Sequence, residues 1–178
     1  MFNANLMKLH LPRLVQELGN RLSDAGFQAY LVGGAVRNLL RGEKPADYDV
    51  TTDARPDQIE KLFRRVIPTG IKHGTVTVFY KNTPFEITTF RTESGYSDSR
   101  RPDSVHFVAS LTTDLERRDF TINAIAVDGC HGDITDPHDG RTDLKKRIIR
   151  AIGTPEDRFS EDGLRLIRAC RFAAQLGF

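Results

Sequence analysis

Two aspartates separated by one residue, Asp47 and Asp49, are suited to holding a divalent cation. Side chains two residues apart on a β-strand point to the same face, so their carboxylates would lie side by side if residues 46–52 form a strand. Carboxylate oxygens bind Mg²⁺, and sites with two such ions catalyse phosphoryl transfer. An Asp-x-Asp sequence near a strand end is also common in turns, so the pair alone leaves both interpretations open.

The residues before the aspartates are suited to binding phosphate. Residues 27–34 are predicted to form a strand that ends in Gly33 and Gly34, and residues 35–42 a short helix. Bare backbone N–H groups at the positive end of a helix accept phosphate oxygens, and Arg37 lies one turn into this helix. The P-loop and dinucleotide-binding fingerprints are both absent. A tight turn would explain the two glycines equally well.

Composition and charge limit the class of protein. The chain has 178 residues, of which 39% are hydrophobic and 28% charged, as expected of a globular protein with one domain and the beginning of a second. Its formal net charge is only +2, so an anion site must come from local arrangement of charges.

Cysteine usage and hydropathy indicate an intracellular protein. Cys130 and Cys170 have no CxxC spacing, so they predict neither a zinc site nor a disulfide framework. No apolar run has the length of a signal peptide core or a membrane span. We therefore expect a cytoplasmic protein with no membrane partner.

Helix and strand patterns alternate along the first half of the chain. Apolar residues at three- and four-residue steps predict a helix over residues 9–25, closed by Gly26. A strand is predicted over 46–52 and a helix over 56–66, with Pro56 at a position that tolerates proline. Two β-branched runs, 74–80 and 84–90, predict an antiparallel hairpin.

The second half is less regular. Residues 91–104 are rich in Ser, Gly and charge and predict a mobile loop, followed by a strand over 105–110. Residues 114–128 suggest a helix start that leads into an apolar segment, and 133–153 a turn followed by a basic helix or strand. From Ser160 to the end we predict one helix, with Ser160 as its N-cap and Glu161 and Asp162 in its first turn.

Six stretches in order resemble the head and early neck of the class II tRNA nucleotidyltransferase and bacterial poly(A) polymerase family. They are "LVGGAVRNLLRGEKPADYDVTT", "KHGTVTVFY", "FEITTFRTESGYSDSRRPDSVHF", "ERRDFTINAIAVD", "ITDPHDGRTDLKKRIIRAIG" and "RFSEDGLRLIRACRFAAQLGF". The resemblance covers roughly residues 29–178. It departs from the family pattern at Asn38, where an acidic residue is usual, and in the turn "GCHG".

This resemblance implies the fold. We expect an α/β (α+β) nucleotidyltransferase head of the polymerase-β type over residues 1–147, with a small mixed, mostly antiparallel sheet backed by helices. Residues 148–178 would begin an all-helical neck that recognises the nucleotide and that we expect to be truncated.

The resemblance also implies that Asp47 and Asp49 hold two catalytic Mg²⁺ ions. Glu86, in the predicted strand 84–90, is the candidate for a third carboxylate; the alternative is a solvated strand glutamate. Gly33, Gly34 and Arg37 would bind the triphosphate. His73 is expected to be structural, because the reaction needs no imidazole.

Two further stretches are implied to contact the nucleotide. In "RRDFTINA", Arg118 would contact the triphosphate or base, with Asp119 and Asn123 close to the ribose. The alternative is a helix-start cluster in which Asp119 pairs locally with Arg117 or Arg118.

Asp162, Arg165, Arg168 and Arg171 recur every third residue, which traces a slanted ridge on a helix. A solvated surface helix gives the same spacing. The resemblance implies that Asp162 and Arg165 read the Watson–Crick edges of CTP and ATP and that the later arginines fix the nucleotide. A carboxylate accepts from the amino group of C or A, whereas U and G present a carbonyl at that position.

The implied reaction is transfer of CMP or AMP from CTP or ATP to the 3′ end of tRNA, with release of pyrophosphate. One alternative is a poly(A) polymerase that uses ATP alone; the undeleted loop within 94–104 and "KHGT" resemble the CCA-adding branch more. Another alternative is a nucleotide- or RNA-binding module without catalysis. The oligomeric state is left open.

Overall fold

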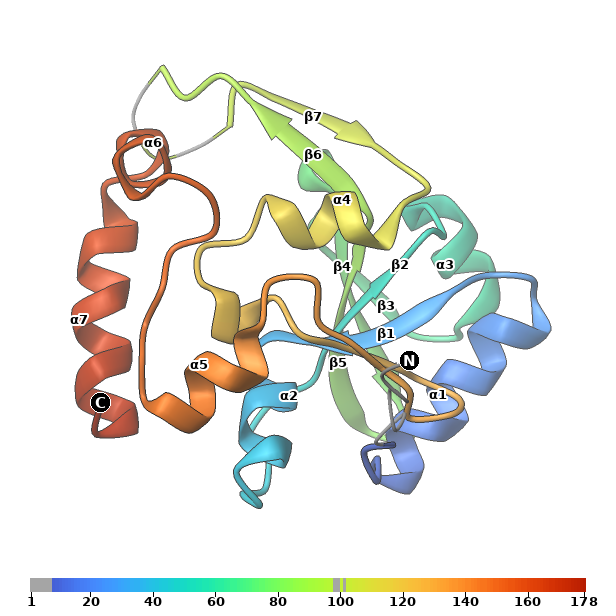
Figure 1. Cartoon of the computed structure of the whole chain (residues 1–178). Coiled ribbons are helices and arrows are strands. Elements are labelled where there is room, and N and C mark those ends of the chain that lie inside the picture. The colour runs from blue at the N-terminus through green and yellow to red at the C-terminus, as the bar shows by residue number, and fades with distance from the viewer. Residues whose placement is uncertain (1–7, 98–99, 101) are drawn as a thin grey trace, which may run out of the picture.

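The computed structural model describes residues 8–97, 100 and 102–178 (Figure 1). The helices are α1 (Arg13–Asp24), α2 (Gly33–Leu40), α3 (Pro56–Leu62), α4 (Leu111–Glu116), α5 (Gly140–Lys146), α6 (Pro155–Glu161) and α7 (Leu164–Leu176), with short 3-10 turns η1 (Ile71–His73) and η2 (Thr121–Asn123). The strands are β1 (Ala29–Val32), β2 (Asp49–Thr52), β3 (Val66–Gly70), β4 (Thr75–Tyr80), β5 (Thr83–Thr89), β6 (Arg91–Ser94), β7 (Ser104–Phe107), β8 (Ala126–Asp128) and β9 (Ile134–Thr135).

A mixed sheet forms the centre of the molecule. Its strand order is β3-β4-β5-β2-β1-β8-β9, and β6 and β7 form a separate hairpin. β2 pairs with β5 in parallel, and the other pairings that the structure describes are antiparallel. The predicted mostly antiparallel sheet backed by helices is therefore confirmed.

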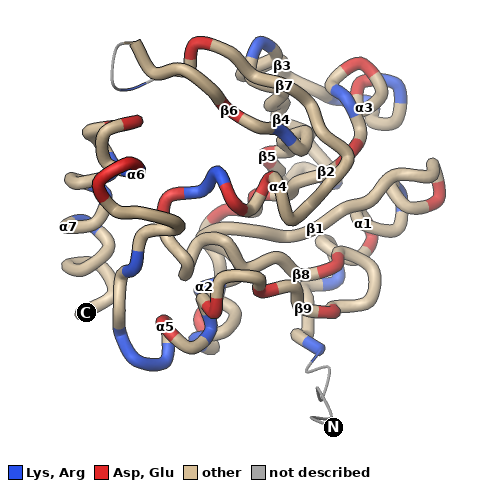
Figure 2. Tube along the Cα trace, turned by 45° about the horizontal axis from the view of Figure 1, so that its top comes forward, with Lys and Arg blue, Asp and Glu red and all other residues tan. Residues whose placement is uncertain are grey.

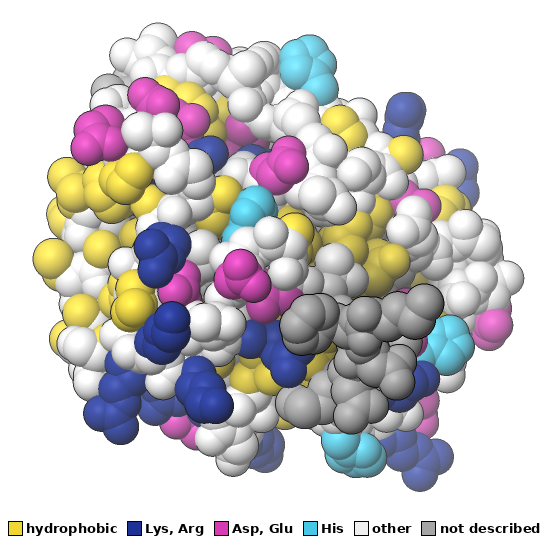
Figure 3. Space-filling model, in the orientation of Figure 1, with side chains coloured by type: hydrophobic (Ala, Val, Ile, Leu, Met, Phe, Trp, Pro, Cys, Tyr) yellow, Lys and Arg dark blue, Asp and Glu magenta, His cyan; other side chains and the backbone are white. Residues whose placement is uncertain are grey.

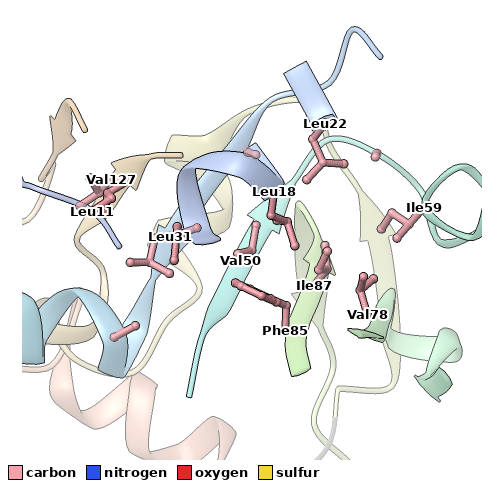
Figure 4. Close-up of a cluster of buried hydrophobic side chains, with 14 of the residues drawn as sticks. Leu11, Leu18, Leu22, Leu31, Val50, Ile59, Val78, Phe85, Ile87 and Val127 are labelled. Atoms are coloured by element: carbon pink, nitrogen blue, oxygen red, sulfur yellow. The ribbon is translucent and has the colours of Figure 1, made fainter. Parts of the chain in front are cut away.

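The main hydrophobic core lies between one face of this sheet and helices α1, α2 and α3 (Figure 4). Leu18 and Leu22 of α1 and Ile59 of α3 pack there against Val50 and Ile87 of the sheet. α1 begins at Arg13, directly after Pro12, so the helix is shorter than predicted although its apolar face is the predicted one. This packing leaves the opposite face of β2 and β5 available for the site.

The predicted strand over residues 46–52 is wrong at its start. β2 begins at Asp49, which pairs with Val32, the last residue of β1. At the next residue, Gly33, the chain turns into α2, so β1 has no residue left to pair with Asp47. Asp47 therefore lies in a bend before the strand, and strand parity does not place its side chain.

Several strands were not predicted. β3 contains Pro68, which marks an edge position, and its first residue, Val66, was assigned to the end of a helix. The predicted loop over residues 91–104 is also wrong at both ends, because β6 and β7 pair from Arg91 to Phe107. Its tip includes residues 98, 99 and 101, which lie outside the described residues.

The single helix predicted from Ser160 is wrong. α6 begins earlier, with Pro155 at its first position, and Ser160 lies inside it. Asp162 is extended, with φ −143° and ψ 105°, so it ends α6, and α7 begins at Leu164. The carboxylate of Asp162 accepts a hydrogen bond from the Leu164 N–H at 2.9 Å. Asp162 thus lies at the junction of two helices and not on one continuous ridge.

α7 lies at one edge of the molecule and carries the C-terminus (Figure 1). Its outer surface exposes Leu164, Leu166 and Ile167, and hydrophobic side chains gather at the same edge of the space-filling view (Figure 3). Its inner surface contributes Phe172 to a small core with Phe120 and Ile122. In the described part of the chain, no helix is long and apolar enough to cross a membrane.

Candidate active site

A cavity of about 790 Å³ lies between the sheet, α2 and α7. Every residue predicted for the site lines it: Gly33, Gly34, Arg37, Asp47, Asp49, Glu86, Arg118, Asp119, Asn123, Asp162, Arg165, Arg168 and Arg171. These residues come from stretches that are far apart in the sequence. The fold therefore brings the predicted site residues together in one cavity. The role of each residue remains a prediction.

The acidic wall of the cavity is built on the parallel pair of strands. Asp49 starts β2, and Glu86 is its direct neighbour on β5. Burial, followed by the charges of Asp47 and Glu86, raises the pKa of Asp49 to about 6, against a lowering influence of Arg118. Carboxylates that repel one another in this way are stabilised by a cation.

Asp47 and Asp49 fit a divalent ion of the Mg²⁺ type, which proteins usually hold by one or two carboxylates together with substrate phosphates. Glu86 lines the same cavity, but it is exposed to solvent, so its assignment as a third carboxylate stays a prediction. In the described part of the chain, no group of three His, Cys, Asp or Glu side chains forms a metal-binding cluster by itself.

Gly33 allows α2 to begin beside this acidic wall. Gly33 has a φ of +68°, and a Cβ at that position would lie 3.2 Å from Oδ2 of Asp49. Gly34 is under no such restraint, since a Cβ there would meet only the end of Arg37 at 3.6 Å. Gly33 is therefore required for both the turn and the close approach, and the start of the eight-residue helix α2 opens into the cavity.

A chain of hydrogen bonds crosses the cavity from α2 to α7. Arg37 donates to Oδ1 of Asn123 at 2.6 Å, and Asn123 donates to Oδ1 of Asp119 at 3.0 Å. Oδ2 of Asp119 accepts from Nε of Arg168 at 2.8 Å. The local pairing considered for Asp119 is therefore wrong, because its carboxylate pairs with an arginine 49 residues away.

Asp114 anchors a second network that the sequence reasoning missed. Its carboxylate has no solvent exposure and accepts hydrogen bonds from Thr51, the Arg91 backbone N–H, Arg117 and Arg118. Figure 2 shows acidic and basic residues adjoining one another just after α4. The spacing of Asp114 to Arg117 and Arg118, three and four residues on, is the signal that would have indicated this anchor.

Glu93, on β6, extends the network toward the hairpin. It pairs with Arg91 at 2.6 Å and with Arg117 at 2.9 Å, and it accepts from the Tyr96 hydroxyl at 3.0 Å. Arg91, Glu93 and Arg117 also line the cavity. Glu93 and Arg117 lie 24 residues apart in sequence, so no local pattern indicates that pair.

The junction between α6 and α7 fixes the last part of the wall. Arg165 is buried, donates to the carbonyl oxygen of Arg158 at 2.9 Å and pairs with Glu161. Asp162 accepts a hydrogen bond from the backbone N–H at the start of α7. Asp162 and Arg165, the two side chains proposed to read the base, are therefore both held at this junction. A carboxylate and a guanidinium facing one cavity can accept from and donate to the edge of a base.

The Glu93–Asp114 network predicts acid sensitivity. Burial raises the pKa of both carboxyls, but the neighbouring arginines outweigh it and hold both pKa values below the ordinary range. The unfolded chain therefore binds more protons, so the stabilisation is complete above about pH 4.5 and is lost as the pH falls through the folded pKa values. Urea unfolding between about pH 7 and pH 3 should show a falling free energy of unfolding. Glu93→Gln should make the fall shallower; an equal slope would contradict this assignment.

Comparison with known proteins places the chain in context. Residues 29–150 match the family model described as the poly A polymerase head domain. A CCA-adding enzyme of Lactobacillus helveticus is 59% identical over 157 residues, which is 88% of this chain and 39% of the relative. A CCA-adding enzyme of Geobacillus thermodenitrificans is 52% identical over 169 residues, covering 94% of this chain and 42% of the relative.

Solved structures agree with this result. The crystal structure of the Bacillus stearothermophilus CCA-adding enzyme in complex with CTP matches with a TM-score of 0.85 and 46% identity, over 94% of this chain and 41% of that chain. The Thermotoga maritima CCA-adding enzyme complexed with tRNA matches with a TM-score of 0.70 and 28% identity, over 94% of this chain and 39% of that chain. The chain thus spans about two fifths of the length of the proteins it matches.

Proposed function

The chain belongs to the poly A polymerase head-domain family, and we propose that within this family it is the nucleotide-binding and catalytic part of a CCA-adding enzyme. The reaction is transfer of CMP and AMP from CTP and ATP to the 3′ end of tRNA, with release of pyrophosphate. The observation that carries the proposal is the meeting, in one cavity, of an acidic wall, a glycine-rich helix start and the arginines of α7. Such a tRNA-processing role belongs in the cytoplasm.

The acidic wall supports a metal-dependent reaction. Asp47 and Asp49 would hold two Mg²⁺ ions, which when bound lower the pKa of an attacking hydroxyl and offset charge on the leaving phosphates. Glu86, beside Asp49 on the parallel strand, adds negative charge to the same wall. Nucleotidyltransferases related to this chain generally use a divalent metal.

The other walls bind and orient the nucleotide. Gly33, Gly34 and Arg37 line the cavity, where the backbone N–H groups of the glycines and the guanidinium of Arg37 would hold the phosphates in line for attack. Asp162 and Arg165 would accept from and donate to the base edge, so C and A fit and U and G do not. Arg118 would contact the triphosphate or base, and Asp119 and Asn123 would lie close to the ribose.

The domain assignment follows from the same proposal. Residues 1–147 form the catalytic head and residues 148–178 the start of the neck, since Asp162 and the arginines of α7 supply the base-recognising wall. A poly(A) polymerase would use a similar cavity, but the relatives described above are named CCA-adding enzymes. The retained carboxylate pair argues against a module that only binds RNA.

Nucleotide preference tests the proposal. We expect the 178-residue chain to bind CTP and ATP more tightly than UTP and GTP in equilibrium binding with Mg²⁺. For the protein extended through its neck, tRNA lacking its 3′ end is offered each nucleotide singly. Incorporation of C before A supports the proposal, unlimited incorporation of A identifies a poly(A) polymerase, and binding without incorporation identifies a module that only binds. The short chain itself should extend tRNA poorly.

A further inference from the structure

Three guanidinium groups surround one aromatic ring that lines the cavity. The Cζ atoms of Arg37, Arg168 and Arg171 lie 4.9, 5.2 and 5.0 Å from the centroid of Phe172. Two of the arginines precede the ring on α7, and the third comes from α2, on the other side of the cavity. All are within the range in which an aromatic ring attracts a cation.

This cluster holds more positive than negative charge. Arg168 pairs with Asp119, and Arg37 donates to the neutral side chain of Asn123. Within the described residues, Arg171 makes no ion pair, and the cluster therefore contains one carboxylate for three cations. Guanidinium groups this close repel one another, and one carboxylate cannot neutralise all three. Another attraction must therefore hold them together.

The ring of Phe172 meets that requirement. Its negative face attracts guanidinium groups without cancelling their charge, which a carboxylate in the same place would do. The ring is buried, with 6% of the residue exposed, and its orientation is fixed by an edge-to-face contact with Phe120 at 5.9 Å and 90°. An aliphatic side chain of similar size would fill the space but present no such face.

We propose that Phe172 is a positioning residue for the nucleotide: its ring holds Arg37, Arg168 and Arg171 in place and leaves their charge available to a nucleoside triphosphate. This inference rests on the proposed function and deepens it. Phe172 acts through the arginines and contacts no reacting atom. Asp47 and Asp49 lie just before and at the start of β2, whereas Phe172 is on α7, so its effect falls on nucleotide binding more than on the chemical step.

Substitution of the ring tests this role. Phe172→Leu and Phe172→Met keep an apolar side chain of similar volume, and we expect each to weaken CTP and ATP binding about tenfold. Phe172→Tyr retains the aromatic face and should restore affinity to near the wild-type value. In the protein extended through its neck, KM for the nucleotide should rise while kcat changes less than KM.

The matched control is Phe159→Leu. Phe159 packs against the same small core as Phe172, and its ring has no cation–ring contact with the three arginines. It should lower thermal stability and leave nucleotide affinity unchanged, when all variants are assayed well below their unfolding temperatures. Cytidine, which lacks phosphates, should bind Phe172→Leu and the wild type nearly equally.

The outcomes separate this inference from the proposed function. Wild-type affinity for CTP in either folded Phe172 variant, Leu or Met, would overturn the positioning role. Equal weakening by Phe159→Leu, or by Phe172→Tyr, would also overturn it, because the ring face would then not matter. A wild-type chain that binds no nucleotide contradicts the proposed function itself.

Discussion

Asp49→Asn is expected to abolish nucleotide transfer, lowering kcat at least about a thousandfold, which corresponds to about 4 kcal/mol of transition-state stabilisation. The substitution keeps the shape of the side chain and removes the charge that holds a metal ion. Asp49 is also the carboxyl whose pKa is raised to about 6 by burial and by its acidic neighbours. Removing that charge relieves repulsion, so the variant should be at least as stable as the wild type.

Single-turnover extension of tRNA by the protein that includes the neck measures the loss of kcat. Equilibrium binding of CTP measures the nucleotide affinity that the variant retains. Asp53→Asn is the matched control: it lies just after β2, outside the cavity, and its Oδ1 accepts from the Gln28 N–H at 2.8 Å, which an amide oxygen can still do. The control should keep wild-type kcat. Turnover near the wild-type rate in Asp49→Asn would refute the role of the acidic wall.

Asp114→Ala should lower the free energy of unfolding by about 3–5 kcal/mol. The carboxylate has no solvent exposure, and its loss leaves Arg118 without this ion pair and Arg117 paired with Glu93 alone. The Thr51 hydroxyl and the Arg91 backbone N–H each lose an acceptor as well. Because breaking a buried pair from one side leaves an uncompensated charge, the loss exceeds that expected of a surface ion pair.

Urea unfolding at neutral pH measures this loss, with Asp57→Ala as the control. Asp57 pairs with Lys61 at 3.8 Å on the exposed surface of α3, a pair that stabilises by well under about 1 kcal/mol. A loss for Asp114→Ala as small as that of the control would mean that Asp114 is not the anchor of α4. The same variant should also weaken nucleotide binding, since Arg118 would no longer be held toward the cavity.

The sequence was informative wherever a local pattern set the structure. The apolar steps of Leu18 and Leu22 predicted the buried face of α1, and the β-branched runs predicted the hairpin of β4 and β5. The cavity residues were predicted from the positions of the motifs and from the family resemblance that these motifs carry. Such positions can be recognised from the sequence alone.

The predictions were wrong where residues far apart in the sequence determine the local structure. β2 starts at Asp49 because its partner strand β1 ends at Val32. The residues around Asp47 carry no sequence pattern that indicates where β1 ends. Ser160 looked like a cap, yet Pro155 begins α6 five residues earlier and Asp162 breaks it. Phe172 was not singled out from the sequence, because the arginine that approaches it from α2 is far away in the chain.

The parallel pairing of β2 with β5 has a consequence for synthesis of the chain. Thr51 and Thr88 on these strands are 37 residues apart, and β2 lies between β5 and β1 in the sheet. A nascent chain that has emerged only as far as β4 thus carries Asp49 on a strand with one bare edge, prone to association with other chains. Nucleotide affinity also needs Asp162 and the arginines of α7, so it should arise only after both β5 and α7 have emerged. Nucleotide binding would then report completion of the cavity during translation.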